Sequence, residues 1–316
     1  MVRFSALKPR TEKATGKTFV FSAPISGKLD LNQAEMRAMT RANPLNQDFK
    51  RNLGFSWDRD ALSAPKQTTV RRAFYRYKQS LPQFVFDATA LEGNPFTFVD
   101  VKTLMDGVTV GGYKISDERQ VLNVIAASKE LAGPVEEDIF RVNRATFDHL
   151  HELVAFEEAL EWGRFRGAGA ITDMTPRVSL GDREFTPPHP TTEGAGPLID
   201  QFERGVSFLE SEIENPLEQS MALFLFGAFQ QFYFDGNKRT ARLMMNGHLM
   251  RNGIDPISVP AADAPAFNEK MVAFYAGADA TEMMEFLVAC NPDCALATGG
   301  APHPEGGEDR NGPEFP

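Results

Sequence analysis

The sequence predicts a mainly α-helical protein that carries one small β-hairpin. Apolar residues recur every three or four positions over residues 117–133, 136–158 and 197–214, which is the spacing of one helix face. Residues 216–234 are apolar nearly all round, as expected for a helix that is buried on every side at the centre of the fold. Short β-prone pieces among turn formers between residues 163 and 197 interrupt this pattern and predict the hairpin.

Composition and charge are those of a soluble globular protein. Of the 316 residues, 42% are apolar and 24% are charged, and the formal net charge is −10. The chain has no run of about 18 apolar residues and its N-terminus lacks the apolar core of a secretory signal, so we predict a cytoplasmic protein without a membrane span. The acidic balance opposes a broad contact with nucleic acid or an anionic membrane, so neither is expected as a partner.

The chain divides into three predicted parts. Residues 1–70 form an N-terminal extension and residues 71–293 form one domain. Residues 294–316 form a tail whose glycine, proline and acidic residues predict disorder.

Local signals predict where elements begin and end inside the domain. Gly133 is expected to end the helix that begins near residue 117. The β-prone pieces at residues 170–172 and 177–180 are expected to contribute to the hairpin.

The stretch DATALEGNPFT, residues 87–97, contains a helix end. Gly93, Asn94 and Pro95 are helix-terminating residues, and they place Glu92 in the last turn of the helix. A carboxylate at a helix C-terminus is unfavourable by about 0.3–1 kcal/mol. Glu92 is therefore interpreted either as a surface residue or as a carboxylate that a cation compensates.

The stretch QQFYFDGNKRTARLMMNG, residues 230–247, contains a polar turn followed by two cations. Asp235-Gly236-Asn237 is common turn chemistry, so one interpretation is a simple connection between two helices. The other is an anion site, because a glycine turn that leads into a helix N-terminus leaves backbone N–H groups free. Arg239 and Arg242 lie three residues apart and could hold phosphates there, and Asp235 could hold a Mg²⁺ ion bound to them.

Three motifs together resemble those of the Fic (Fido-domain) family. QFYFDGNKRTAR resembles the family signature H-P-F-x-[DE]-G-N-G-R-x-x-R, and TALEGN resembles its inhibitory motif [ST]-x-x-x-E-[GN]. RVSLGDREFTPP resembles the β-hairpin flap that is followed by two prolines. The motifs occur in the family order, and the resemblance covers about residues 80–290. It implies the helical Fido fold with a hairpin flap.

The resemblance also implies an activity and a role for each matching residue. Most Fic proteins transfer AMP from ATP to a hydroxyl group of a protein. Asp235 would bind Mg²⁺, and Glu92 would pair with Arg242 and so block productive ATP binding. The residues implied in nucleotide binding are Gly236, Asn237, Lys238, Arg239 and Arg242. The flap would dock a target segment by strand addition, through Thr175, Arg177, Val178 and Ser179.

Four positions depart from the signature, and one of them bears on the chemistry. Phe232, Tyr233 and Lys238 replace proline, phenylalanine and glycine, and an N-K-R variant occurs in the Doc branch, which transfers phosphate. Gln231 stands where the family has its catalytic histidine. An amide cannot act as a general base. His189, near the flap, is considered as a replacement.

These observations predict an autoinhibited and weak Fic-type adenylyltransferase of bacterial type. ATP with Mg²⁺ is the expected ligand, and the acceptor is a protein that the sequence does not identify, or the chain itself. A non-catalytic nucleotide-binding regulator and a phosphate-transferring Doc-like kinase are the alternatives. A homo-oligomer is left open.

Overall fold

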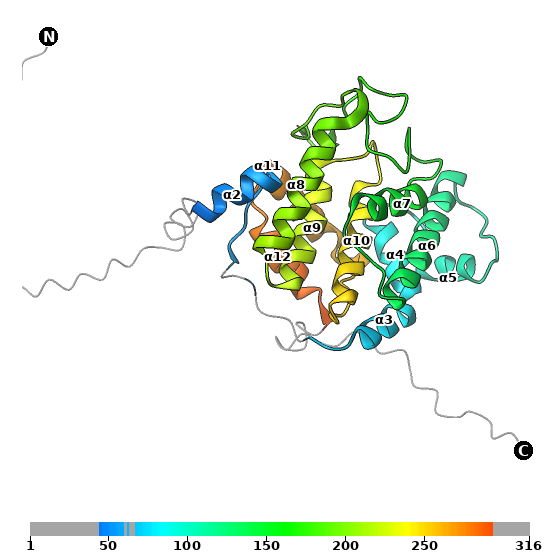
Figure 1. Cartoon of the computed structure of the whole chain (residues 1–316). Coiled ribbons are helices and arrows are strands. Elements are labelled where there is room, and N and C mark those ends of the chain that lie inside the picture. The colour runs from blue at the N-terminus through cyan, green and yellow to red at the C-terminus, as the bar shows by residue number, and fades with distance from the viewer. Residues whose placement is uncertain (1–43, 60–61, 63–66, 293–316) are drawn as a thin grey trace, which may run out of the picture. The chain divides into compact units, whose positions relative to one another are not determined.

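The computed structural model describes residues 44–59, 62 and 67–292 (Figure 1). The predicted tail and most of the predicted N-terminal extension lie outside these residues. The described part is mainly helical with one two-stranded sheet, which confirms the predicted fold class. No helix among the described residues is long and apolar enough to cross a membrane.

Most connections between the elements are short, but the one over residues 155–177 is long. In order the elements are α2 (Pro44–Leu53), α3 (Val70–Gln79), α4 (Leu81–Ala90), α5 (Phe98–Met105), α6 (Ile115–Glu136), α7 (Arg144–Val154), β1 (Val178–Ser179), β2 (Glu184–Phe185), the short 3-10 helix η2 (Glu193–Ala195), α8 (Gly196–Glu212), α9 (Pro216–Gln230), α10 (Asn237–Arg251), the 3-10 helix η3 (Ala261–Asp263), α11 (Ala264–Gly277) and α12 (Thr281–Ala289).

Helices α9 and α10 form the centre of the described domain, as Figure 1 shows. The apolar helix predicted over residues 216–234 is α9, which ends at Gln230 rather than at residue 234, and almost all of its side chains are buried. It begins at Asn215, whose side chain caps the first turn, and Pro216 follows at the first helical position. Gly227 lets α10 approach closely, because a Cβ atom at this position would lie 2.7 Å from the Cβ atom of Ala241.

Helix α6 is longer than the sequence predicts. Gly133 does not end it, and the helix continues through Pro134 to Glu136. Leu131 and Val135 are both buried in the core, on either side of the predicted stop. Burial of these two side chains therefore outweighs the weak helix propensity of the intervening glycine.

The predicted hairpin is present, but only one of its two predicted pieces is a strand. Strand β1 lies within the predicted piece 177–180, and it pairs antiparallel with β2 so that Val178 faces Phe185. Residues 170–172 are not in a strand. The Phe185 ring lies 4.9 Å from the ring of Phe229 and anchors the hairpin to α9.

The predicted extension contributes helix α2 to the same hydrophobic core. The rings of Phe49 and Trp57 stack with centroids 4.4 Å apart, and both side chains are buried. The indole N–H of Trp57 donates to Oε1 of Glu218 on α9 at 2.8 Å. The domain boundary at residue 71 stays a prediction, but residues 44–57 pack against the domain.

We expect effects of different size from adding one methyl group at two helical glycines. A Cβ atom at Gly205 on α8 would lie 2.2 Å from the buried ring of Phe226, whereas one at Gly133 would meet nothing within 4 Å. Gly205→Ala should lower the free energy of unfolding by about 1–3 kcal/mol through overpacking. Gly133→Ala, the matched control, should change it by less than about 1 kcal/mol, because the gain in helix propensity is offset by the restriction that Pro134 places on the residue before it. Urea denaturation of both variants measures this, and equal effects would contradict the packing described for α8 and α9.

Candidate functional site

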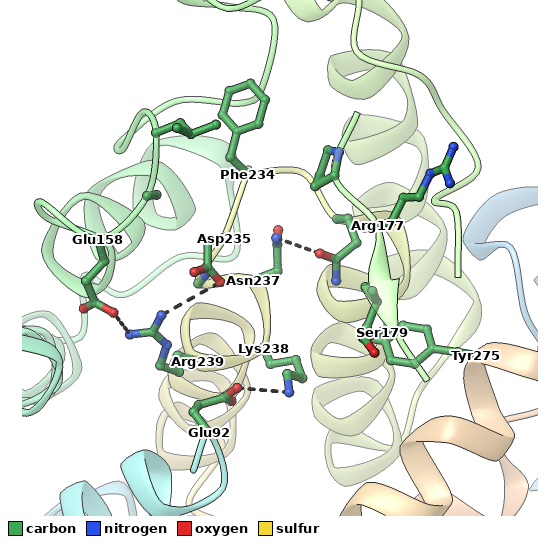
Figure 2. Close-up of a pocket in the computed structure, with 16 residues that line it drawn as sticks. Glu92, Glu158, Arg177, Ser179, Phe234, Asp235, Asn237, Lys238, Arg239 and Tyr275 are labelled. Carbon is green, nitrogen blue, oxygen red and sulfur yellow. Dashed lines mark hydrogen bonds and ion pairs between the residues drawn. The ribbon is translucent and has the colours of Figure 1, made fainter. Parts of the chain in front are cut away.

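A cavity of about 490 Å³ lies where the start of α10, the preceding turn, the hairpin and the turn after α4 meet (Figure 2). Its lining includes most of the residues that the sequence singled out, from Glu92 through the flap to Arg239. Two predicted residues lie outside the lining, Arg242 and Thr175. The hydroxyl oxygen of Thr175 instead accepts a hydrogen bond from the backbone N–H of Thr191 at 2.8 Å.

The turn between α9 and α10 is held by backbone conformation and by one amide. Gln231 and Gly236 both have positive φ, of 49° and 72°. Asn237 is the first residue of α10 rather than part of the turn, and α9 already ends at Gln230, so the connection covers residues 231–236 rather than the predicted 235–237. Its side chain accepts the N–H of Tyr233 at 2.9 Å and donates to Oε1 of Gln231 at 3.0 Å. Asn237 therefore fixes the shape of the turn.

The N-terminus of α10 is uncapped and opens on the cavity. Among the described residues no side chain caps this helix, and Gly236, Asn237 and Lys238 all line the cavity. The first backbone N–H groups of a helix have no partner inside the helix, and the helix dipole adds positive potential at this end. The start of α10 is thus suited to an anion.

Glu92 lies against two cations of α10. Its Oε1 atom is 2.9 Å from Nη2 of Arg242, and its Oε2 atom is 3.0 Å from Nζ of Lys238. The predicted contact between Glu92 and Arg242 is confirmed, while the contact with Lys238 was not predicted. Glu92 lies in the turn just after α4, whose last helical residue is Ala90, and not in its last turn. Burial by itself raises the pKa of Glu92, but the charges of Lys238, Arg242 and Arg239 together hold this pKa at about 2.

Arg239 contacts a carboxylate that sequence reasoning missed. Its Nη1 atom lies 2.8 Å from Oε2 of Glu158, and its Nη2 atom lies 4.0 Å from Oδ1 of Asp235 (Figure 2). Glu158 follows α7 and lies 81 positions before Arg239 in the sequence. No local pattern links two residues so far apart, so only the packing of α7 beside α10 identifies the pair.

Asp235 presents an exposed carboxylate to the cavity. Its side chain is 66% exposed, and its Oδ1 atom accepts the N–H of Gly236 at 2.6 Å. The described residues contain no group of three or more potential metal ligands. Mg²⁺ in phosphate-transfer sites binds through one or two carboxylates together with phosphate oxygens and water, so a single exposed carboxylate beside an anion site fits this ion.

Gln231 is held at the cavity wall with both ends of its amide occupied. It is 7% exposed, and its Nε2 atom donates to the carbonyl of Ala228 at 2.6 Å. The Oε1 atom accepts from Asn237, as described above. Arg166, another residue that the sequence analysis missed, donates through Nε to the carbonyl oxygen of Gln231 at 2.6 Å. The side chain and the backbone of Gln231 are thus both fixed.

None of the described residues that line the cavity is a histidine. The ring of His189, the proposed replacement for the missing base, lies 3.3 Å from Oε1 of Gln201 on α8. His248 contacts the hydroxyl oxygen of Ser220 at 2.7 Å in the core. The geometry therefore gives no support to His189 as a base for this site.

His151 supports the site from behind. Its Nδ1 atom accepts the N–H of Gly163 at 3.1 Å, so the proton is on Nε2, which donates to the carbonyl oxygen of Asp235 at 2.8 Å. The imidazole stacks on the ring of Tyr233 with centroids 3.6 Å apart. Burial lowers the pKa of His151 to about 3, so the ring is neutral near pH 7.

The flap forms the wall opposite Asp235 and Glu158 (Figure 2). Arg177, Val178 and Ser179 line the cavity, and Arg177 pairs with Glu184 across the hairpin at 2.8 Å. In the described part of the chain, β1 has one partner strand, β2, so its other edge is unpaired. An unpaired strand edge can accept an extended peptide.

Comparisons with known proteins agree on one family. Residues 135–249 match the model of the Fic/DOC family. The chain is 24% identical over 270 residues to the protein adenylyltransferase Fic of Nematostella vectensis, covering 80% of this chain and 56% of the relative. It is 26% identical over 216 residues to the protein of the same name in Drosophila yakuba, and this match covers 67% of this chain and 41% of the relative. The chain therefore spans about half the length of these curated relatives.

Solved structures agree on the fold. Fic-1 from C. elegans superimposes with a TM-score of 0.57 at 17% identity, covering 84% of this chain and 76% of that one. A Fic domain containing signaling protein from Bacteroides thetaiotaomicron superimposes with a TM-score of 0.56 at 19% identity, covering 78% of this chain and 96% of that one.

We expect His151 to make stability depend on pH. Its pKa in the folded protein is about 3, below the usual 6.5, so as the pH falls this imidazole takes up a proton in the unfolded chain before it does so in the folded protein. The stability contributed by neutral His151 is present above pH 6.5 and is lost as the pH falls from 6.5 towards 3. Between pH 7.5 and 5.0, the free energy of unfolding should fall by about 2 kcal/mol more in the wild type than in His151→Gln. Denaturant titrations at both pH values test this, and an equal fall in both proteins would contradict it.

Proposed function

The chain belongs to the Fic/DOC family, and on this premise we propose that it transfers AMP from ATP to a hydroxyl group of a protein, slowly and under inhibition by Glu92. The observation that carries the proposal is the cavity itself. There the uncapped start of α10, two cations and one exposed carboxylate face the same space. The homologues named protein adenylyltransferase Fic support AMP as the transferred group.

The polar groups of the cavity suit the phosphates of a nucleotide. The backbone N–H of Asn237 and the side chains of Lys238 and Arg239 would bind phosphate oxygens, and the N–H of Gly236 would join them by exchanging Oδ1 of Asp235 for a phosphate oxygen. Asp235 would hold Mg²⁺, which neutralises charge on bound phosphates. Arg242 lies behind Glu92 and would join these cations once Glu92 has left.

The proposed transfer forms one bond and breaks another. The acceptor hydroxyl oxygen attacks the α-phosphorus of ATP, the bond to the pyrophosphate oxygen breaks, and the hydroxyl proton has to reach a base. Gln231 occupies the position from which the family histidine takes this proton, and an amide has no usable pKa. The loss of a general base costs about 10²–10⁴ in rate, or roughly 3–5 kcal/mol of barrier. The electrostatic contributions remain, because the cations and the helix N-terminus are present.

Glu92 is the proposed inhibitor of this site. Its single carboxylate forms ion pairs with both Lys238 and Arg242, and its low pKa keeps the carboxylate charged at neutral pH. A phosphate group that approaches these cations must displace it. The flap would receive the target segment along the free edge of β1, with Arg177, Val178 and Ser179 beside the acceptor. The acceptor is an unidentified protein or a second copy of the chain.

Specific observations favour two alternatives. The amide of Gln231 is locked by hydrogen bonds at both ends, which favours a regulator that binds nucleotide without chemistry. Lys238 lies in the cavity wall where the family signature has glycine, which favours the phosphate transfer of the Doc branch. The position of the label transferred from ATP separates these alternatives from AMP transfer.

We expect Glu92→Gly to tighten the binding of ATP with Mg²⁺. The variant frees Lys238 and Arg242, and a competing charge-assisted hydrogen bond is worth about 1–3 kcal/mol, or roughly 5–150-fold in affinity. Glu92→Gln keeps the bulk of the side chain without its charge and should give a smaller gain. Titration calorimetry measures both, and an unchanged affinity in Glu92→Gly would remove the basis for inhibition by Glu92.

We expect Gln231→His to restore chemistry in the Glu92→Gly background. The new imidazole supplies the missing base, so transfer should rise by about 10²–10⁴-fold over Glu92→Gly alone. ATP labelled on the α- or the γ-phosphate, followed on the chain itself and on candidate targets, reveals the rate and the group moved. Arg242→Ala added to both changes is the control and should abolish the gain. A variant that binds ATP but transfers nothing above background would favour the non-catalytic alternative.

A further inference from the structure

The cavity contains two carboxylates that hold cations of α10 in different ways. Glu92 comes from the turn after α4 and uses both of its oxygens on the cations Lys238 and Arg242. Glu158 comes from the loop after α7 and contacts one cation, Arg239. The proposed function uses the first carboxylate as an inhibitor and assigns nothing to the second.

Helix α6 braces Glu158 from behind. The side chain of Asn123 donates to Oε1 of Glu158 at 2.7 Å and to the carbonyl oxygen of Phe156 at 2.8 Å. Gln120, one helical turn earlier, lies 3.3 Å from Oε2 of Glu158. Asn123 is 6% exposed, and the side chain of Glu158 is 12% exposed. Glu158 is therefore fixed to a second helix, whereas Glu92 depends on the cations that a ligand would claim.

This braced carboxylate holds Arg239 beside, but not on, Asp235. The guanidinium of Arg239 is 5% exposed and directs Nη1 to Glu158 at 2.8 Å. Its Nη2 atom is 4.0 Å from Oδ1 of Asp235, which is longer than a hydrogen bond. Without a partner on the other side, the attraction between opposite charges would draw the guanidinium onto Asp235 and pair the two. Asp235, which suits Mg²⁺, and Arg239, which suits phosphate, would then form an ion pair with each other and be less available to a ligand.

We propose that Glu158 is a positioning residue that keeps Arg239 and Asp235 apart, so that both stay available to a phosphate ligand and its Mg²⁺ ion. This inference rests on the proposed nucleotide site and assigns Glu158 a role opposite to that of Glu92. Glu92 competes with the ligand, whereas Glu158 prepares the site for it. A long cationic side chain that is already held in place loses less conformational entropy when the ligand binds, so the complex is more stable.

The test compares ATP affinity with and without Mg²⁺ in the full chain with Glu92→Gly, whose cavity is free of the competing carboxylate. Adding Glu158→Gln should weaken ATP binding about 2- to 10-fold in the presence of Mg²⁺, the range expected for one long side chain that loses its fixed position. The gain in affinity that Mg²⁺ brings should shrink, because Asp235 becomes paired with Arg239. Asn123→Ala, which removes the brace and keeps the charge of Glu158, should change affinity in the same direction but less.

Matched variants separate positioning from general destabilisation. Glu157→Gln changes the adjacent carboxylate, which pairs with Arg119 at 2.9 Å outside the cavity lining, and should leave both affinities unchanged. In an Arg239→Ala background, Glu158→Gln should no longer weaken binding, because no guanidinium remains to move. If Glu158 had only a structural role, Glu158→Gln would weaken ATP binding both with Arg239 and with Arg239→Ala.

The outcomes distinguish this inference from the function on which it rests. Tighter binding in Glu158→Gln would make Glu158 a second competitor and overturn the proposal, and so would an unchanged dependence on Mg²⁺. If the Glu92→Gly chain itself binds no ATP, the proposed nucleotide site fails. If that chain binds ATP and Glu158→Gln does not weaken it, only the role of Glu158 fails.

Discussion

The structure depends on the pairing of buried cations at the start of α10. Arg239 and Arg242 are each 5% exposed, inside a core made largely of aromatic and aliphatic side chains. An unpaired charge in such a place is costly, so each guanidinium requires a carboxylate. The fold brings Glu158 to Arg239 and Glu92 to Arg242, each from a different part of the chain. These pairs keep α10 compatible with the core and keep positive charge next to the cavity.

The turn before α10 is shaped by interactions that have no direct part in chemistry. Arg166 holds the carbonyl of Gln231, and neutral His151 holds the carbonyl of Asp235. The amide of Asn237 closes the turn from inside. Together they fix a backbone with two positive φ angles, so that the helix N-terminus and Asp235 face the same space. A rigid supporting frame of this kind keeps the site in place even though the signature around it has changed.

The cavity combines several cationic groups with the amide of Gln231. Cations, the start of α10 and the exposed carboxylate of Asp235 line this cavity, and the Gln231 amide beside them is hydrogen-bonded at both ends. Glu92, the proposed inhibitory carboxylate, also pairs with Lys238. Displacing Glu92 therefore exposes two cations rather than one, and any anion that enters the cavity meets a stronger positive field.

The sequence by itself predicted several helices, the hairpin and the local motifs, although the helix predicted over residues 136–158 forms only over Arg144–Val154. Helical periodicity predicted the central helix α9, turn chemistry predicted the break before α10, and the resemblance of three motifs predicted the contact between Glu92 and Arg242. These signals are read within short stretches or matched to a known pattern. Gly133 shows the limit of local reading, because burial of its neighbours carried α6 past the predicted stop.

Only the tertiary structure decided which distant side chains meet. The contact of Glu158 with Arg239, the brace from Asn123 and the place of His189 outside the cavity all depend on how helices pack. Residues separated by tens of positions leave no periodic trace of their contact in a single sequence. Their pairing follows from the requirement that every buried charge find a partner once the core has formed, and this requirement acts in three dimensions.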